Sequence, residues 1–498
     1  MRNLRWGLVA LVMTGAAACG GKMLSSPGGT GVGGAGGNSN RWVGSVQPLN
    51  RNVDILFLID DSSSMRLAQD NLRRSLPTFM TRLQDPPGLP NIHIAVVSQD
   101  MGAGDGSISG CDSTGGKNGI FQYTARGTCT ATGLQAGATY ISNIGGVANY
   151  TGNAADVFAC IAALGESGCG YEHQFAAILR ALGADGRGAA PAENQDFLRP
   201  DAYLVIIMLT NEDDCSATTG VPLFDTATNT NAQSQLGPPS NFRCNEFGHL
   251  CDPGNGSFVH PSRFAPNNDV TQMVSYPTCR SNDTEGYLLS VADTASRIKA
   301  LKADPSQVAV VSIQGPPAPY TVTWKNPSTS DTSCGAASCP WAVIAHACTA
   351  SDGSFADPGV RTSEFVRAFG NHGLELPICS DNLAPSLDRA ASMVNSLFGP
   401  PCLTSLGRDP ANPTQADCKV TERVSNGTGG LTNKKVPSCA ESGGIPPCWQ
   451  LTAQQVCNGV ALDVLPDPNV SASTATTVTY DCAKCSPTDP DPVADCIF

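Results

Sequence analysis

Two aspartates and three serines directly follow one of the most apolar runs in the chain. The run VDILFLI occupies residues 53–59, and DDSSS occupies residues 60–64. Asp60, Ser62 and Ser64 alternate along one turn, which lets their side chains converge on a single point. Carboxylate and hydroxyl oxygens are the ligands that Mg²⁺ and similar hard cations prefer. The spacing therefore favours a divalent-cation site, and a serine-rich helix N-cap is the alternative interpretation.

The segments around this turn alternate between strand and helix patterns. Short continuous apolar runs are typical of strands that are buried on both faces of a parallel sheet. Such runs occur at 53–59, 92–98, 203–209 and 308–313, and helical spacing of apolar residues occurs at 65–83, 175–182, 288–301 and 383–397. The alternation predicts an α/β fold with a doubly wound, mainly parallel sheet. Ligands of such sheets bind at the carboxyl ends of the strands, where Asp60 stands.

The apolar strand, the D-x-S-x-S motif, Met65 and the helical pattern after it together resemble the opening of a von Willebrand factor A domain. The resemblance implies that residues 49–400 form one such domain, with disulfide-stapled insertions at about 100–155, 215–282 and 315–360. It also implies that Asp60, Ser62 and Ser64 form the first loop of a metal-ion-dependent adhesion site. The bound cation would then be Mg²⁺, or Mn²⁺ or Ca²⁺ in its place.

The other two loops of that site depart from the family pattern. Glu172 stands where the family usually has a threonine, and we expect it either to be a ligand or to be a solvated carboxylate in the first turn of a helix. Thr210 matches the third loop, but Asn211 follows it where an aspartate is usual. Asp213 or Asp214 could replace that aspartate as a ligand, or could be a solvated loop charge. The altered loops imply either a changed cation affinity or a weakened site.

The N-terminus has the pattern of an export signal. Arg2 and Arg5 precede the short apolar segment WGLVALVMTG, and small residues lead up to Cys19. We predict a signal peptide at residues 1–18, lipid attachment at Cys19 as in bacterial lipoproteins, and a glycine-rich and serine-rich tether over residues 19–48. A glycine after Cys19 favours the outer membrane or the cell surface. Cleavage after Ala18 and free secretion are the alternative.

The cysteines support an exported protein. The chain has 21 cysteines, and setting Cys19 aside leaves 20, an even number suited to disulfides in an oxidising compartment. Proximity in the sequence suggests two candidate pairs, Cys111–Cys129 and Cys160–Cys169, and Cys215 could pair with Cys244 or Cys251. We predict that residues 401–498 form a small cysteine-rich, β-leaning appendage, and that the CAKC segment at 482–485 contributes structural disulfides.

These features favour a binding protein. A net charge of −13 argues against nucleic acid as a partner. We find no nucleophile motif or phosphate-binding loop, so we predict that the protein is not an enzyme. The expected function is that of an envelope-anchored adhesion module whose cation engages a protein or glycan. The partner could supply a carboxylate to the cation, and only the lipid anchor would contact the membrane. The alternative is a disulfide-braced envelope scaffold with a vestigial metal site.

Overall fold

The computed structural model describes residues 41–46, most of residues 51–485, and Cys496. The gaps within 51–485 are 86–87, 104–107, 109, 112–114, 127–128, 228–232, 326–340, 399–401, 404, 426–430, 455–458 and 466–476. The predicted signal peptide, the lipidation site Cys19 and most of the predicted tether therefore lie outside the described residues. No helix in the described part of the chain is both long and apolar enough to cross a bilayer.

The chain divides into two compact units, which we describe separately. The described residues of one unit fall within 47–402 and 450–464, and those of the other fall within 1–46, 403–449 and 465–498. One boundary lies near residue 400, where the sequence changes character, but residues 450–464 belong to the larger unit, so residues 401–498 do not form one separate appendage. The tether prediction was wrong at its C-terminal end, because residues Arg41–Val46 form strand β1 of the second unit.

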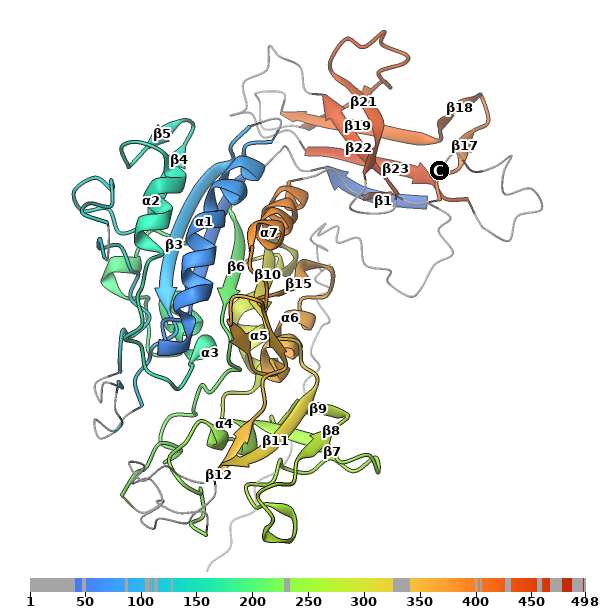
Figure 1. Ribbon diagram of the computed structural model, residues 1–498. Helices are drawn as coiled ribbons and strands as arrows, with labels where there is room; N and C mark the ends of the chain where they lie inside the picture. Colours follow the sequence, from blue (N-terminus) through green and yellow to red (C-terminus); the bar gives the residue numbers. More distant parts are fainter. Residues whose placement is uncertain are drawn as a thin grey trace, which may run out of the picture. The chain divides into compact units, whose positions relative to one another are not determined.

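The larger unit is built on a seven-stranded sheet of order β15–β10–β6–β2–β3–β4–β5 (Figure 1). Strands β15, β10, β6, β2 and β3 pair in parallel, whereas β4 pairs antiparallel with β3 and with β5. The strands are β2 (Asn52–Ile59), β3 (Asn91–Ser98), β4 (Ile141–Ile144), β5 (Val147–Ala148), β6 (Tyr203–Leu209), β10 (Val308–Gln314) and β15 (Gly373–Pro377). The prediction of a mainly parallel α/β sheet is thus confirmed.

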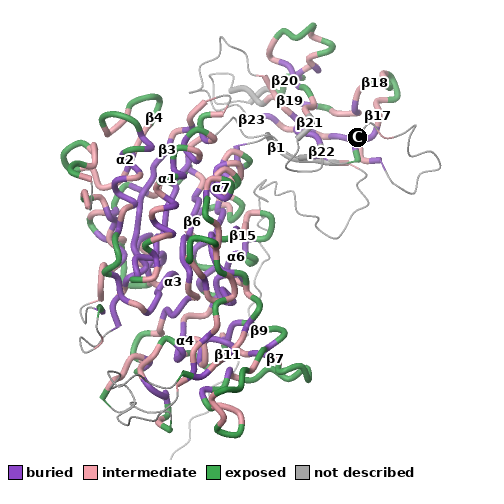
Figure 2. The backbone as a smooth tube through the Cα atoms, in the orientation of Figure 1, coloured by how far each residue is buried: buried purple, intermediate pink, exposed green. Residues whose placement is uncertain are grey.

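Helices cover both faces of this sheet, because successive residues of a buried strand point to opposite sides. Ile55 and Phe57 of β2 pack into the core under α1 (Arg66–Leu83), α2 (Ala154–Ile161) and α7 (Ala384–Leu397). Leu56 and Leu58 pack into the opposite core, under α3 (Gln174–Ala181), α5 (Val291–Lys299) and α6 (Val360–Arg367). Figure 2 shows the central strands as buried along most of their length. The continuous apolar runs follow from this double coverage.

Two insertions carry further small elements. The first contains α4 (Phe242–Gly248), β7 (His249–Asp252), β8 (Val274–Tyr276) and β9 (Thr278–Ser281), and the second contains β11 (Tyr320–Lys325), β12 (Trp341–Ile344), β13 (Cys348–Thr349) and β14 (Phe355–Ala356). Strands β8, β11 and β12 form one antiparallel sheet. Short 3-10 helices are η1 (Ser63–Met65), η2 (Ala192–Asn194), η3 (Pro266–Asn268), η4 (Pro305–Gln307) and η5 (Gly370–His372).

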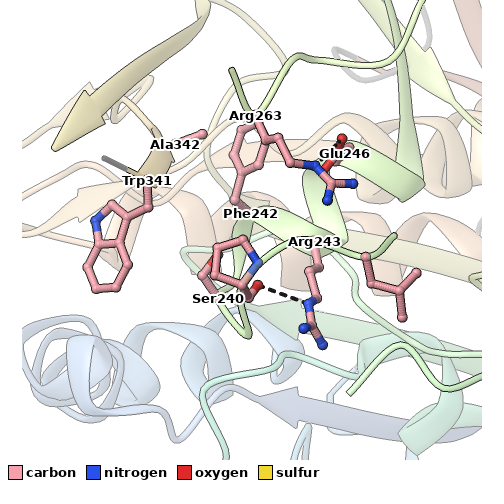
Figure 3. A pocket seen from close by; sticks show the side chains of 9 residues that line it. Ser240, Phe242, Arg243, Glu246, Arg263, Trp341 and Ala342 are labelled. Carbon is pink, nitrogen blue, oxygen red and sulfur yellow. Dashed lines mark hydrogen bonds and ion pairs between the residues drawn. The ribbon is translucent and has the colours of Figure 1, made fainter. Parts of the chain in front are cut away.

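Buried arginines hold the first insertion together. Arg243 donates hydrogen bonds to the main-chain carbonyls of Leu223, Gly237 and Pro238. Arg263 forms an ion pair with Glu246 at 2.8 Å, as Figure 3 shows. Both guanidinium groups therefore bind partners that lie within the first insertion.

The disulfides correct two predicted pairs. The structure joins Cys111 to Cys169 and Cys129 to Cys160, so the predictions of Cys111–Cys129 and Cys160–Cys169 were wrong. The second pair is nested within the first, because the fold brings the loop after β3 against α2 and the loop before α3, and proximity in the sequence does not reveal this. Cys215 pairs with Cys244, which was one of its two expected partners. Cys251–Cys279 joins β7 to β9, and Cys348–Cys379 joins β13 to the segment that follows β15.

The smaller unit contains an antiparallel sheet of order β1–β23–β19–β20. Its disulfides Cys418–Cys482 and Cys485–Cys496 use both cysteines of the CAKC segment, as expected of a structural role. Cys439 pairs with Cys448. The C-terminal strands are β16 (Cys402–Leu403), β17 (Arg408–Asp409), β18 (Asn412–Ala416), β19 (Cys418–Ser425), β20 (Leu431–Val436), β21 (Cys448–Gln454), β22 (Gly459–Leu465) and β23 (Thr477–Ala483).

Candidate cation site

The D-x-S-x-S motif lies at the point where the order of the strands in the sheet reverses. Strands β2 and β6 are neighbours, and the chain order of the strands runs outward from them in both directions. Their carboxyl ends meet, because the amide of Asp60 donates to the carbonyl of Leu209 at 3.0 Å. A reversal of strand order opens a crevice at this edge, which is where ligands of doubly wound sheets bind. The motif therefore lies at the carboxyl ends of β2 and β6, the edge of the sheet where a ligand is expected.

Asp60 is fully buried and is fixed by hydrogen bonds to both carboxylate oxygens. Oδ1 accepts from the amide of Ser62 at 2.8 Å, and Oδ2 accepts from the Thr210 hydroxyl at 3.0 Å. Among the described residues, no basic side chain forms an ion pair with this carboxylate. Burial raises the pKa of Asp60 to about 6. A buried carboxylate with no cationic partner is electrostatically costly, and a bound cation would relieve that cost.

The two motif serines face the third loop. The hydroxyls of Ser62 and Ser64 lie 3.1 Å apart, and the Ser64 hydroxyl donates to Asn211 Oδ1 at 3.2 Å. Asn211, the residue in the place of the usual aspartate, therefore lies beside the motif. Ser63 is exposed and contributes nothing to this cluster. Asp60, Ser62, Ser64 and Asn211 thus come together at one place.

Glu172 belongs to the site and is not a solvated first-turn carboxylate. It is 2% exposed and lies two residues before α3, and its carbonyl accepts from the amide of Cys215 at 2.6 Å. Its Oε1 atom is buried and has no hydrogen-bond partner. Burial, together with the charges of Glu212 and Asp60, raises the pKa of Glu172 well above its ordinary value. The second loop therefore presents an unsatisfied acidic oxygen near Asp60.

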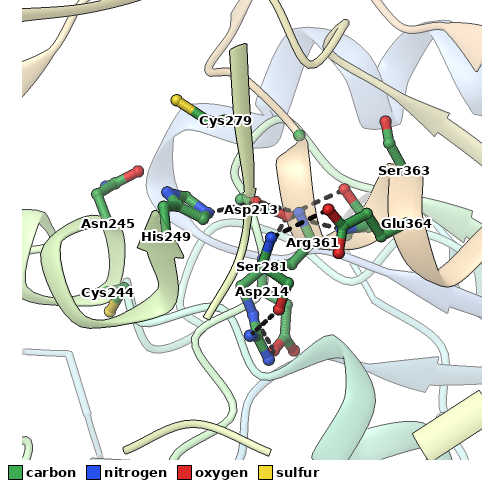
Figure 4. A network of polar contacts seen from close by, with 12 residues as sticks. Asp213, Asp214, Cys244, Asn245, His249, Cys279, Ser281, Arg361, Ser363 and Glu364 are labelled. Atoms are coloured by element: carbon green, nitrogen blue, oxygen red, sulfur yellow. Dashed lines mark hydrogen bonds and ion pairs between the residues drawn. The ribbon is translucent and has the colours of Figure 1, made fainter. Parts of the chain in front are cut away.

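Asp213 and Asp214 are engaged elsewhere, as Figure 4 shows. Asp213 accepts from His249 at 2.9 Å and from the main-chain amides of Arg361 and Thr362 at the start of α6. Burial acts to raise its pKa, but these hydrogen bonds outweigh burial and hold the pKa below its ordinary value. The hypothesis that Asp213 is a metal ligand is not supported, because structural hydrogen bonds occupy both of its oxygens.

Asp214 forms a second buried anchor in the same loop. It pairs with Arg361 at 3.1 Å and accepts from the amide of Phe175 in the first turn of α3. Both partners lie outside the motif loop, one in α6 and one in α3. Asp214 therefore fixes the positions of these helices relative to the loop that carries Asn211 and Thr210, and it is also unavailable as a ligand.

Asp61 has a positioning role that the sequence analysis did not anticipate. It is fully buried, accepts from the Ser98 hydroxyl at 2.6 Å and forms an ion pair with Lys117. Its carbonyl accepts from the amide of Gly168 at 2.8 Å. Asp61 thus joins the motif loop to the loop after β3 and to the loop that carries Glu172.

Three more residues near the site escaped the sequence analysis. Gln99 follows β3, and its amide group donates to Asp60 Oδ1 at 3.3 Å while its Oε1 atom accepts from the amide of His173 at 3.2 Å. Its position at a strand's carboxyl end was a usable signal. Glu212 and Asp357 lie close enough to influence each other's charge. Asp357 follows the short strand β14 in an insertion, and no sequence pattern marks it.

The residues present fit a hard divalent cation. Carboxylate, hydroxyl and amide oxygens gather around Asp60, and two buried acids lack basic partners among the described residues. Within the described ranges, no group of three or more His, Cys, Asp or Glu side chains is arranged to hold a metal ion. A cation here would accordingly depend on the hydroxyl oxygens of Ser62 and Ser64 in addition to Asp60.

Comparison with known proteins adds the following findings. No protein-family model matches the chain, and no curated protein matches it. Among solved structures, the vWF domain of the type V pili tip protein Mfa5 from Porphyromonas gingivalis is similar at 13% identity and a TM-score of 0.28, covering 71% of this chain and 98% of that one.

Two pilus adhesins are similar at comparable levels. RrgA from Streptococcus pneumoniae has 10% identity and a TM-score of 0.24, with 89% of this chain and 57% of that chain covered. SpaC from Lactobacillus rhamnosus GG has 13% identity and a TM-score of 0.28, with 87% and 39% covered. This chain therefore spans little more than half of the first adhesin and less than half of the second. Because these TM-scores are low, the functional proposal rests on the geometry of the site.

Proposed function

We propose that this protein is a binding module of von Willebrand factor A type, which holds a divalent cation at the carboxyl ends of β2 and β6 and uses it to engage a partner. The observation that carries the proposal is the buried Asp60 carboxylate, held by Thr210 at 3.0 Å and left without a basic partner among the described residues. Asp60, Ser62 and Ser64 would hold the cation, with Asn211 and Glu172 beside them. A bound cation would supply a Lewis-acidic position that attracts an oxygen atom of a protein or glycan.

The proposed location is outside the cytoplasm. The disulfides of both units support an oxidising compartment, because such bonds are rare in reducing ones. We further propose that the protein is held at the bacterial envelope through a lipid on Cys19, a residue outside the described ranges. Metabolic labelling with a radioactive fatty acid tests this, because a Cys19→Ser variant should lose the label.

Calorimetric titration of the full chain with Mg²⁺ and Mn²⁺ tests the cation proposal. The expected result is saturable binding that Asp60→Ala abolishes. Asp156→Asn is the matched control, because Asp156 is an exposed aspartate in the first turn of α2. Identical isotherms for the wild type and Asp60→Ala would overturn the proposal.

One observation favours the alternative of a structural scaffold with a vestigial site. Glu172 and Glu212 are close enough to form a side-chain hydrogen bond, so a proton shared between them would partly stabilise the site without a cation. Capture of envelope proteins by the full chain, compared with and without EDTA, separates the two functions. Capture that persists undiminished in EDTA would favour the scaffold.

A further inference from the structure

A small acidic cavity lies next to the candidate cation site. Glu172, Glu212 and Asp357 line it together with the amide side chains of Asn241 and Asn245. Its free volume is about 10 Å³, which is the room that one water-sized group needs. The cavity therefore admits a compact head group and excludes a bulky one.

Two acids of this cavity, Glu172 and Glu212, lack the basic partner that the other acids of its lining have. Asp213 and Asp214 line the same cavity, but each is paired, with His249 at 2.9 Å and with Arg361 at 3.1 Å. Glu172 and Glu212 form no ion pair with a basic side chain among the described residues. The Oε1 atom of Glu172, a residue that is 98% buried, has no hydrogen-bond partner.

Glu212 and Asp357 bring further acidic oxygens to the cavity. Glu212 Oε2 accepts one hydrogen bond from the Asn241 amide at 3.0 Å, and Asp357 accepts from His346 at 2.7 Å. Like charges that repel one another in a buried site favour the entry of a positive group.

The shape and charge of the cavity discriminate among positive groups. A metal ion requires several acidic ligands at short distances, and no three acids in the described residues are arranged in that way. A guanidinium is planar and wide, whereas an ammonium is a compact charge with three hydrogen-bond donors. Three acidic side chains around a water-sized space match those three donors.

We propose that this cavity binds the ammonium group of a lysine side chain presented by the partner, through Glu172, Glu212 and Asp357. The inference rests on the proposed function and deepens it, because it names the partner chemistry beside the cation. With a divalent cation at Asp60, the site would still be negative once all four acids, Asp60, Glu172, Glu212 and Asp357, are ionised. A partner that offered only a carboxylate would meet repulsion there.

The test uses the full chain and three immobilised peptides with blocked ends: Gly-Lys-Gly, Gly-Arg-Gly, and Gly-Lys-Gly with an acetylated lysine side chain. Binding is measured by surface plasmon resonance in Mg²⁺ and again in EDTA. The expected result is clear retention on the lysine peptide, at least about tenfold weaker retention on the arginine peptide, and none on the acetylated peptide.

Variants connect this retention to the cavity. Glu212→Gln is expected to weaken retention on the lysine peptide about tenfold while leaving Mg²⁺ binding unchanged. Glu193→Gln removes the same charge in η2 and is expected to change neither property. Equal retention on the lysine and arginine peptides by the wild type would overturn the inference whatever the variants do. Unchanged retention by Glu212→Gln, or loss of its Mg²⁺ binding, would also overturn it.

The two proposals fail in different ways. If no cation binds, titration with Mg²⁺ is flat for every variant, and the cation proposal falls. The lysine peptide is still tested in EDTA, where the cavity is more negative and retention is expected to be at least as strong. Retention on the lysine peptide without Mg²⁺ binding would thus preserve the inference about the cavity alone.

Discussion

The hydroxyl of Thr210 lies 3.0 Å from Oδ2 of Asp60 and joins the ends of two neighbouring strands whose residues are 150 positions apart in the chain. Because Asp60 is fully buried, loss of this donor would leave a carboxylate oxygen unsatisfied. We predict that Thr210→Val weakens Mg²⁺ binding about tenfold and lowers the free energy of unfolding by about 1–3 kcal/mol. Thr210→Ser keeps the donor and is expected to retain most of the affinity, as calorimetry would show. Equal affinities for the valine and serine variants would contradict this role.

The variant Asp213→Asn tests whether Asp213 has a structural role or is a ligand of the cation. Asp213 accepts from His249 and from the amides that start α6, so its loss should lower the free energy of unfolding by about 1–3 kcal/mol. The Mg²⁺ affinity of this variant should stay within about twofold of the wild-type affinity. That is a difference of about 0.4 kcal/mol in binding free energy. Asp60→Asn is the matched variant and should lose Mg²⁺ binding. If Asp213→Asn lost as much affinity as Asp60→Asn, Asp213 would have to be a ligand.

Gly168→Ala should disturb the motif loop. A Cβ atom at residue 168 would lie 2.9 Å from the carbonyl oxygen of Asp61 and nearer still to its carboxylate. Overpacking of this kind costs about 1–3 kcal/mol, which denaturant unfolding would measure. Gly170→Ala is the control two residues away, because its Cβ would meet nothing within 4 Å. Equal stabilities of the two variants would argue against tight packing of Gly168 on Asp61.

The buried acids predict a stability that depends on pH. The pKa of Asp60 is raised to about 6 and that of Glu212 to about 8, in both cases chiefly by burial. The folded chain therefore keeps protons that the unfolded chain has already released, so stability without a cation should fall as pH rises from about 4 to about 8. Asp213, whose pKa is lowered, affects stability only below that window.

Thermal unfolding at about pH 5 and about pH 8, in EDTA and in Mg²⁺, checks this dependence. Mg²⁺ should raise the melting temperature more at the higher pH, because Asp60 is then ionised and able to bind it. A variant carrying both Glu172→Gln and Glu212→Gln should show a smaller fall of stability with pH in EDTA. Equal falls of stability with pH in the wild type and in this double variant would refute the raised pKa values of Glu172 and Glu212.

The sequence by itself determined the sheet and the first loop of the site. Continuous apolar runs such as residues 203–209 are typical of strands covered on both faces, and helical spacing after Met65 predicts α1. The carboxyl end of such a strand is where ligands bind, so Asp60, Ser62 and Ser64 could be identified from one local pattern. Local patterns act over a few residues, and these elements depend on little else.

Only the tertiary structure decided what the other acids do. Asp213 and Asp214 stand beside Glu212 in the sequence, yet they pair with His249 of β7 and Arg361 of α6. Glu212 lines the cavity without such a partner among the described residues. No local pattern around Asp61 indicates the ion pair that it forms with Lys117. The nested disulfides Cys111–Cys169 and Cys129–Cys160 have the same origin. The partner of a charged side chain or of a cysteine depends on which distant loops contact each other in the fold. Spacing along the chain does not predict those contacts.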